Sequence, residues 1–143
     1  MNKAGVMNSI EVEIHNDPMI SYMIPDTAGI TQRWRGVECE EGWKDLIMRT
    51  LRGITIADPE KVLRIFLIKE KFGGIRIHLD HYAELLSQAH KNIIDSFIGN
   101  AENQSFQICE ECGSVDVVQR IIVRGWIHVR CEKCAEKFKE EIV

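Results

Sequence analysis

The sequence predicts an α+β fold in which a small N-terminal α+β unit precedes a C-terminal module organised around cysteines. Three observations predict it: runs that alternate apolar and polar residues, a long stretch with helical spacing of apolar residues, and two Cys-x-x-Cys pairs. The 143 residues are enough for about one average domain or two small ones. An apolar fraction of 45% and a charged fraction of 28% exclude a disordered or fibrous chain.

The net charge and the N-terminal sequence limit the partners that we expect. There are 18 basic and 22 acidic residues, a formal charge of −4, which disfavours non-specific binding to nucleic acid. No window approaches the roughly 18 uninterrupted apolar residues of a membrane helix, and the first residues lack the apolar core of a secretory signal. We therefore expect a cytoplasmic protein without membrane contact.

The N-terminal half predicts a strand, a loop, a helix, a turn and a second strand in that order. Residues 10–14 (IEVEI) alternate and predict a strand, whereas residues 16–37 contain proline and glycine, show no period and predict a loop. Residues 43–52 predict a helix, and residues 58–59 (Asp-Pro) predict a turn before a strand at 62–69. The expected buried face of the helix is formed by Leu46, Ile47, Thr50 and Leu51.

A β-hairpin and the longest helix follow. Gly73-Gly74 separates the 62–69 run from the alternating residues 75–79, which predicts two strands joined by a tight turn. Asp80 is expected to cap the next helix, whose apolar stripe should face the hairpin. The stripe comprises Tyr82, Leu85, Leu86, Ala89, Ile93, Ile94, Phe97 and Ile98. The polar residues 99–105 predict a boundary between domains 1–104 and 105–143, with residues 1–36 poorly defined.

Four of the five cysteines form the pairs Cys109/Cys112 and Cys131/Cys134, separated by 18 residues. Structural disulfides are improbable in a cytoplasmic chain, and a thioredoxin-like redox site needs one pair rather than two. Two such pairs with this spacer are the standard pattern of a four-cysteine zinc site. The sequence therefore predicts one structural zinc ion. The remaining Cys39 is expected to be a small buried apolar residue.

The residues around the four cysteines predict a treble-clef zinc finger. Gly113 follows the first pair at a position that favours positive φ. Residues 115–123 and 126–130 predict two strands around an Arg124-Gly125 turn, and residues 135–143 predict a helix. In a zinc ribbon, the second cysteine pair would lie on another hairpin instead.

No catalytic constellation is evident, so we expect no enzymatic activity. A site closed by four cysteines leaves no ligand position for water. The deaminase signature H-x-E with P-C-x-x-C is absent. A nuclease of the HNH type needs an Asp-His step within the finger hairpin, which offers only His128; Asp80-His81 lies too early in the chain. His78 and His81 lack further ligands at metal-binding spacing.

Several of these motifs together resemble a known family. They are Cys39-Glu-Glu-Gly-Trp43, the run 68–76 (IKEKFGGIR), and C-x-x-C-G followed by G-W-I and the second C-x-x-C. They are similar to an uncharacterised family of small bacterial and phage proteins with a KEKFGG[IL]R motif and a C-terminal zinc finger, over about residues 39–135. The resemblance implies an accessory gene, often carried on mobile elements, and brings no activity with it.

The function that we expect is binding to another protein, as a non-enzymatic inhibitor or regulator from a phage or other mobile element. Trp126, with Arg124 and Arg130 beside it, has the composition of a binding hot spot, or else packs between the finger and the preceding helix. Lys69, Lys71 and Arg76 form a second, cationic candidate surface, or the solvated face of the hairpin. The alternative function is nucleic-acid binding through Arg120, Arg124 and Arg130; a nuclease or hydrolase is the third.

Overall fold

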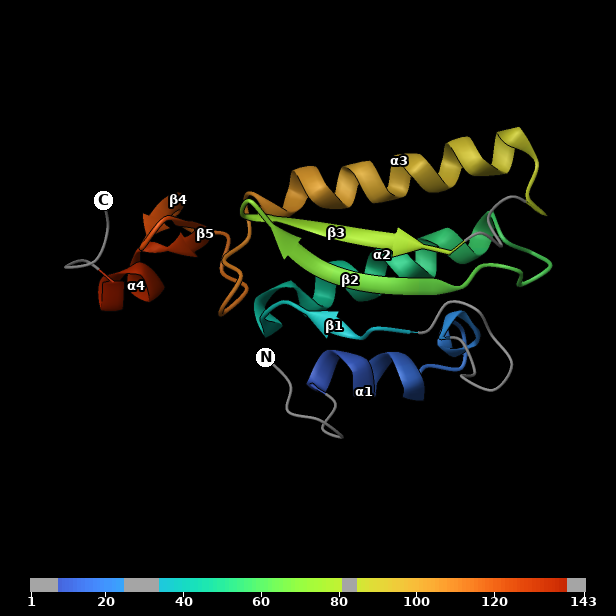
Figure 1. Ribbon diagram of the computed structural model, residues 1–143, viewed down its shortest axis with the longest axis horizontal. Coiled ribbons are helices and arrows are strands. Elements are labelled where there is room, and N and C mark those ends of the chain that lie inside the picture. Colours follow the sequence, from blue (N-terminus) through green and yellow to red (C-terminus); the bar gives the residue numbers. More distant parts are fainter. Residues whose placement is uncertain (1–7, 25–33, 81–84, 139–143) are drawn as a thin grey trace.

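The computed structural model describes residues 8–24, 34–80 and 85–138, and it is an α+β structure as predicted (Figure 1). The N-terminal part contains three helices and a three-stranded sheet, and the C-terminal part contains a β-hairpin followed by a short helix. In chain order the helices and strands are α1 (Ser9–Asn16), β1 (Val37–Glu38), α2 (Lys44–Ile56), β2 (Ile65–Lys71), β3 (Gly74–Leu79), α3 (Gln88–Ser105), β4 (Val118–Val123), β5 (Trp126–Cys131) and α4 (Glu132–Ala135). Turns of 3-10 helix occupy Ser21–Met23, Glu41–Trp43 and Glu136–Phe138.

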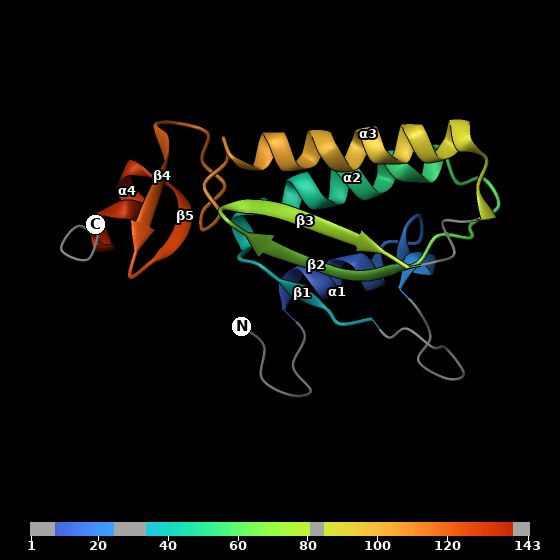
Figure 2. The ribbon, with the colours of Figure 1, turned by 45° about the horizontal axis from the view of Figure 1, so that its top comes forward.

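The sheet has the order β1-β2-β3, with β1 parallel to β2 and β3 antiparallel to it. Helices α2 and α3 lie side by side on one face of this sheet (Figure 2). They approach closely at Gly53, where an added Cβ would lie 2.4 Å from Phe97. The predicted face of α2 is confirmed, because Leu46, Ile47, Thr50 and Leu51 are all buried.

The predicted hairpin is confirmed, but its turn lies one residue earlier than Gly73-Gly74. Lys71 pairs with Gly74, so Phe72 and Gly73 are the two turn residues. Both have positive φ, 54° and 85°, as a type I′ turn requires. Glu70 stabilises the turn, because its carboxylate accepts a hydrogen bond of 2.7 Å from the N–H of Gly73.

The prediction of a strand at residues 10–14 is wrong, because these residues belong to helix α1. The side chain of Asn8 caps the helix by accepting a 2.9 Å hydrogen bond from the N–H of Glu11. Ile10 and Ile14, four residues apart, are fully buried. Over five residues, the alternation of a strand and the spacing of a helix both place these isoleucines on one face. The pattern therefore does not distinguish a strand from a helix.

Helix α1 covers the outer edge of the sheet at β1. Glu11 accepts a 2.8 Å hydrogen bond from the N–H of Val37, and Asn8 donates one of 2.9 Å to the carbonyl of Val37. Glu11 is 5% exposed and its carboxylate lies against Gly36. Gly36 has φ of +94°, and a Cβ added there would lie only 2.7 Å from the Glu11 carboxylate. The neighbouring loop prediction at 16–37 is also partly corrected, since it contains a 3-10 turn and β1; residues 25–33 lie outside the described part.

Two features around α3 differ from what the sequence indicated. Asp80 does not cap this helix, which begins at Gln88 after Ser87, whose hydroxyl accepts a hydrogen bond from the N–H of His90. The polar residues 99–105, expected to form the boundary before the finger, are the last turns of α3. Ser105 is fully buried and its hydroxyl accepts a 3.0 Å hydrogen bond from the N–H of Ile75 in β3.

The apolar stripe of α3 is narrower than predicted. Ile94 is buried, and Leu86, Phe97 and Ile98 pack against the core, whereas Leu85, Ala89 and Ile93 are exposed. Tyr82 lies outside the described residues. The inner face contacts both β3 and α2, so the prediction that it faces the hairpin holds for part of the stripe.

The C-terminal hairpin agrees with its predicted turn and second strand, but β4 begins at Val118, three residues after the predicted start of the first strand. Strands β4 and β5 are antiparallel, and Arg124 and Gly125 form the turn with φ of 52° and 85°. The helix begins at Glu132, three residues before the predicted start, and residues 139–143 lie outside the described part. The hairpin's own apolar cluster is small: Ile121, Val123 and Ala135, with Phe138 packed against them.

Within the described ranges, none of the helices combines the length and apolar character needed to cross a lipid bilayer.

Candidate metal centre

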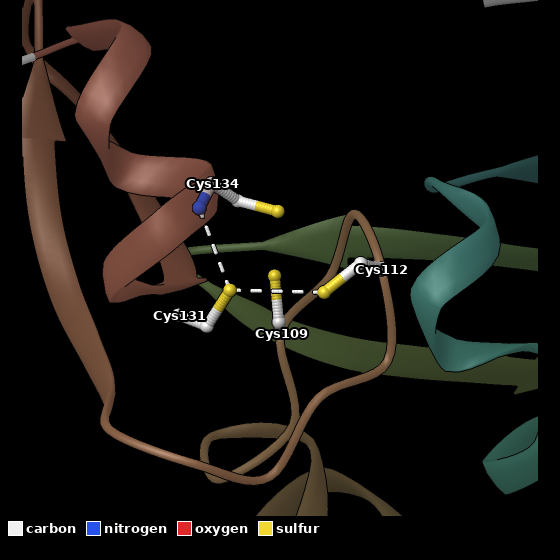
Figure 3. Close-up of side chains that lie close together, drawn as sticks. All are labelled: Cys109, Cys112, Cys131 and Cys134. Atoms are coloured by element: carbon white, nitrogen blue, oxygen red, sulfur yellow. Dashed lines mark hydrogen bonds between the residues drawn. The ribbon is translucent and has the colours of Figure 1, made fainter.

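Three segments bring the four paired cysteines together, as Figure 3 shows. Cys109 and Cys112 lie in the turn after α3, Cys131 ends β5 and Cys134 lies in α4. Their sulfur atoms all lie within 4.8 Å of one another, and those of Cys112 and Cys131 are 3.7 Å apart. A tetrahedral ion with metal–sulfur bonds of ~2.3 Å separates its sulfur ligands by ~3.8 Å. The four thiols are therefore placed to hold one metal ion.

The turn from Cys109 to Gly113, here called the knuckle, is shaped by backbone hydrogen bonds. The N–H of Gly113 donates to the carbonyl of Cys109 (2.9 Å), and the N–H of Cys109 donates to the carbonyl of Ser114 (2.8 Å). Gly113 has φ of +82°, as its position after the pair predicts. In α4, the N–H of Cys134 donates to the sulfur of Cys131 at 3.4 Å, so the side chain of Cys131 caps the start of the helix.

The knuckle and the residue before it contact the 3-10 turn Glu41–Trp43, which leads directly into α2. The N–H of Gly42 donates a 2.8 Å hydrogen bond to the carbonyl of Glu110, and the indole N–H of Trp43 donates one of 2.9 Å to the carbonyl of Ile108. Gly42 packs so closely against the knuckle that a Cβ added at Gly42 would lie 2.1 Å from the carbonyl oxygen of Cys109. The metal centre is thus held by residues more than sixty positions earlier in the chain.

A buried arginine joins the knuckle to the preceding unit. Arg130 is 4% exposed, and its guanidinium lies 2.6 Å from the carboxylate of Glu40 and 3.8 Å from that of Glu110, and also pairs with Glu111. It lies over the ring of Phe138 at 5.0 Å from the centroid. Arg130 is therefore not an exposed cation, and its prediction as part of a binding surface is corrected: its place in β5 turns it inward, toward carboxylates that compensate its charge.

The environment of the thiols favours early ionisation at one of them. Burial raises the pKa of Cys109, but the backbone N–H groups of Cys131, Cys112 and Glu111 outweigh this and lower it to about 7. Burial, followed by hydrogen bonds to the other thiols, raises the pKa of Cys134. Because the thiolate is the form that binds metal, Cys109 is ready to bind an ion near neutral pH.

Cys39 does not belong to the metal centre. It packs, partly buried, against the main core, as predicted for a lone cysteine. Burial, followed by the charges of Glu110, Glu40 and Glu70, raises its pKa to about 12. A thiol of this kind is a poor nucleophile at neutral pH.

An acidic cleft of about 940 Å³ lies between the knuckle and the sheet. Its lining includes Cys39, His128 and Arg35, and six glutamates: Glu38, Glu40, Glu41, Glu70, Glu110 and Glu111. Glu110 is 4% exposed and accepts a 2.7 Å hydrogen bond from the N–H of Val129. This charge repels phosphate, so nucleic acid is disfavoured on this face.

The exposed candidates on the hairpin are Trp126 and two arginines. Trp126 is 71% exposed, so it does not pack between the finger and α3. Arg124 is exposed in the turn, and Arg120 is exposed on β4 with its guanidinium 5.9 Å from the ring centroid of Phe106.

The three cations of the second candidate surface, Lys69, Lys71 and Arg76, differ in their surroundings. Arg76 pairs with Glu102 at 3.3 Å, the ammonium of Lys71 lies 5.6 Å from the ring centroid of Phe72, and Lys69 is half-buried. Of the histidines considered, His78 is exposed and His81 lies outside the described residues.

Sequence reasoning missed the groups that surround the metal centre. His128 stacks on Phe138, with ring centroids 5.9 Å apart, and its Nδ1 lies 3.6 Å from the carboxylate of Glu110. Burial, and then the charge of Arg130, lowers the pKa of His128. The only sequence signal was the glutamate pair inside the first C-x-x-C, which does not show that one of the two is buried.

The fold and the site define an α+β chain with a four-cysteine metal centre. Comparison with protein-family models, with curated proteins and with solved structures gives no match to this chain.

Proposed function

We propose that this chain is a non-enzymatic, zinc-stabilised interaction protein that acts in the cytoplasm by binding another protein. Zinc is the ion that four thiolates in a tetrahedron suit best among divalent metals of the cell, and such closed sites are structural. The hairpin's own cluster of four apolar side chains is too small to fold this module alone. Zinc would therefore supply folding free energy rather than chemistry.

The order of elements supports a treble-clef type of finger. The first cysteine pair lies in a knuckle, a β-hairpin follows, and the second pair lies where the hairpin ends and α4 begins. A zinc ribbon would place the second pair in a hairpin turn. The position of Cys134 inside α4 favours the treble clef.

The observation that carries the proposed protein binding is the exposed apolar surface of the finger. Trp126 pairs across the hairpin with Val123, yet Val123 is 6% exposed and Trp126 is 71% exposed. Val115, Val117 and Ile122 are exposed in the same module. Val117 also has φ of 48°, a conformation that costs a β-branched residue ~1–2 kcal/mol. Exposed aromatic and apolar side chains next to arginine are typical of protein interfaces.

The resemblance described above gives this interaction a biological setting, an inhibitor or regulator carried by a phage or another mobile element. Nucleic-acid binding is the weaker alternative, because Arg130 is buried and the cleft next to the metal centre is acidic. The cations left for it on the hairpin include Arg120 and Arg124.

The test is a pull-down from nuclease-treated host lysate with the tagged, zinc-loaded chain. We expect one protein in stoichiometric amount, retained by the wild type and lost with Trp126→Ala. Ile56→Ala is the matched control, since Ile56 is 77% exposed but lies at the end of α2. Retention that survives Trp126→Ala unchanged would contradict the proposed surface. The same pull-down is made from untreated lysate, and a protein that is retained there but absent after nuclease treatment would assign the function to nucleic-acid binding.

A further inference from the structure

The four cysteines of the metal centre differ in their access to solvent. Cys109 and Cys131 are buried and Cys134 is half-buried, whereas Cys112 is exposed. Oxidants reach thiolates in proportion to their exposure, and a zinc-bound cysteine is a thiolate at neutral pH. A small oxidant in water therefore meets the centre at Cys112.

An oxidised Cys112 has a partner within reach on the other side of the metal centre. The sulfur of Cys131 is 3.7 Å from that of Cys112, which is van der Waals contact, and a disulfide requires ~2.05 Å. Cys112 sits in the knuckle and Cys131 at the end of β5, so a bond between them would cross-link the two halves of the metal site.

We propose that the metal centre is a peroxide-sensitive switch in which Cys112 is oxidised first and forms a disulfide with Cys131, with release of zinc. The inference rests on the zinc proposed above and is independent of any partner protein. It gives the exposure of Cys112 a role, since a purely structural site would be as stable with this sulfur buried.

The chemistry balances with hydrogen peroxide as the two-electron oxidant. The Cys112 thiolate attacks one peroxide oxygen, the O–O bond breaks, and a sulfenic acid and hydroxide form. The Cys131 thiolate then attacks the Cys112 sulfur, an S–S bond forms, the S–O bond breaks, and a second hydroxide leaves. Two protons from the buffer convert the two hydroxides to water, so two thiolates, one peroxide and two protons give one disulfide and two water molecules. Two of the four ligands are consumed, so the ion loses its tetrahedral site.

Loss of the ion removes the metal bonds that join the knuckle to the end of β5 and to α4. The disulfide would replace the link to β5, and the knuckle would keep its hydrogen bonds to Gly42 and Trp43 and the ion pairs of Arg130. Cys134 in α4 loses its metal bond and gains no bond in exchange. We therefore expect the switch to loosen α4, while the knuckle stays attached to the N-terminal unit.

The test uses the full zinc-loaded chain, with zinc content measured before peroxide is added. Zinc release is followed with a chromogenic chelator, and disulfides are mapped by mass spectrometry of proteolytic peptides. We expect one zinc per chain at the start, release of the ion together with a Cys112–Cys131 disulfide, and recovery on reduction with zinc present. Cys39 is the internal control and should stay reduced, because it is partly buried and its pKa is high.

Two matched variants test the order of events. Cys112→His and Cys134→His both leave a three-cysteine, one-histidine set that binds zinc. We expect Cys112→His to slow peroxide-driven zinc release by roughly tenfold or more, since exposure governs oxidation, and Cys134→His to slow it much less. Equal protection by both variants, or a Cys109–Cys112 disulfide in the wild type, would overturn the inference. A chain without zinc at the start would instead refute the zinc proposal itself.

Discussion

Replacing Gly42 with alanine tests whether contact with α2 holds the metal centre together. The new Cβ would lie 2.1 Å from the carbonyl oxygen of Cys109 and 2.6 Å from that of Glu110. Carbon–oxygen contacts are normally no shorter than ~3.3 Å, so the knuckle would have to retreat by roughly 1 Å. Gly42 does not have positive φ, and the effect would therefore be steric.

The cost of this substitution has two parts. Overpacking costs ~1–3 kcal/mol. The displaced knuckle would also lose the hydrogen bonds from Gly42 and Trp43, at ~0.5–1.5 kcal/mol each. The sum is about 2–6 kcal/mol, which predicts a loss of zinc affinity of at least about 30-fold if it falls on the metal-bound state.

The assay is competition for zinc between the protein and a chelator of known affinity, together with thermal unfolding of the zinc-loaded chain. Gly99→Ala is the matched control, because an added Cβ there has nothing within 4 Å and Gly99 lies in α3. This control should be neutral or stabilising by up to ~1 kcal/mol. If Gly42→Ala keeps its zinc affinity within a factor of two or so and its melting temperature, the idea that α2 supports the metal centre is refuted.

Three further outcomes are expected. Removing zinc with a chelator should unfold the hairpin and α4, seen as a loss of β and helical circular dichroism that zinc restores; an unchanged spectrum would contradict a structural ion. Tyr22→Phe should cost about 1–2 kcal/mol, measured by urea unfolding, because Tyr22 donates a 2.6 Å hydrogen bond to the buried Asp58. Burial, and then Asp58, raises the pKa of Tyr22; since the folded pKa exceeds the unfolded one, this stabilisation is complete below pH ~10 and falls as pH rises above it, and the variant should lack that decline. Gly36→Ala should destabilise by about 2 kcal/mol or more, because it adds strain at positive φ and a clash with Glu11; a melting temperature equal to that of the wild type would contradict this.

The finger was the most predictable part of the chain, because metal chemistry restricts the sequence. Two C-x-x-C pairs can meet at one ion only if the segments between them turn back, and the Arg124-Gly125 turn and alternating strands showed where this occurs. The cysteine cluster, the hairpin and the positive φ of Gly113 all agree with the structure. In the finger, the local sequence and the geometry of the metal site require the same structure.

The errors fell where local patterns were ambiguous. Residues 10–14 satisfy both a strand and a helix, and the deciding groups, the Asn8 cap and the contact of Glu11 with Val37, are a single residue and a tertiary contact. Residues 99–105 were not predicted to be helical because most of their side chains are polar, while the buried Ala101 and Ser105 are too small to stand out as an apolar stripe.

The contacts that join the two parts of the chain could not be predicted from the sequence. Gly42 and Trp43 meet the knuckle across more than sixty residues, and no periodicity reports on such a pair. Arg130 had the composition of an interface residue, but its burial depends on Glu40, ninety residues earlier. Charge pairs of this kind follow from the fold and do not predict it.

The carboxylate of Glu11 bears on how the outer edge of this sheet is kept from pairing with other molecules. It occupies the N–H of Val37, and the amide of Asn8 occupies the carbonyl, so the outer rim of β1 offers no free backbone groups at this residue. An edge strand whose backbone groups are free can pair with extended segments of other molecules, which promotes aggregation. Loss of the Glu11 side chain would therefore do more than weaken the fold. It would expose a strand edge that can pair with other molecules, and the first observable effect would be concentration-dependent precipitation of a still largely folded protein.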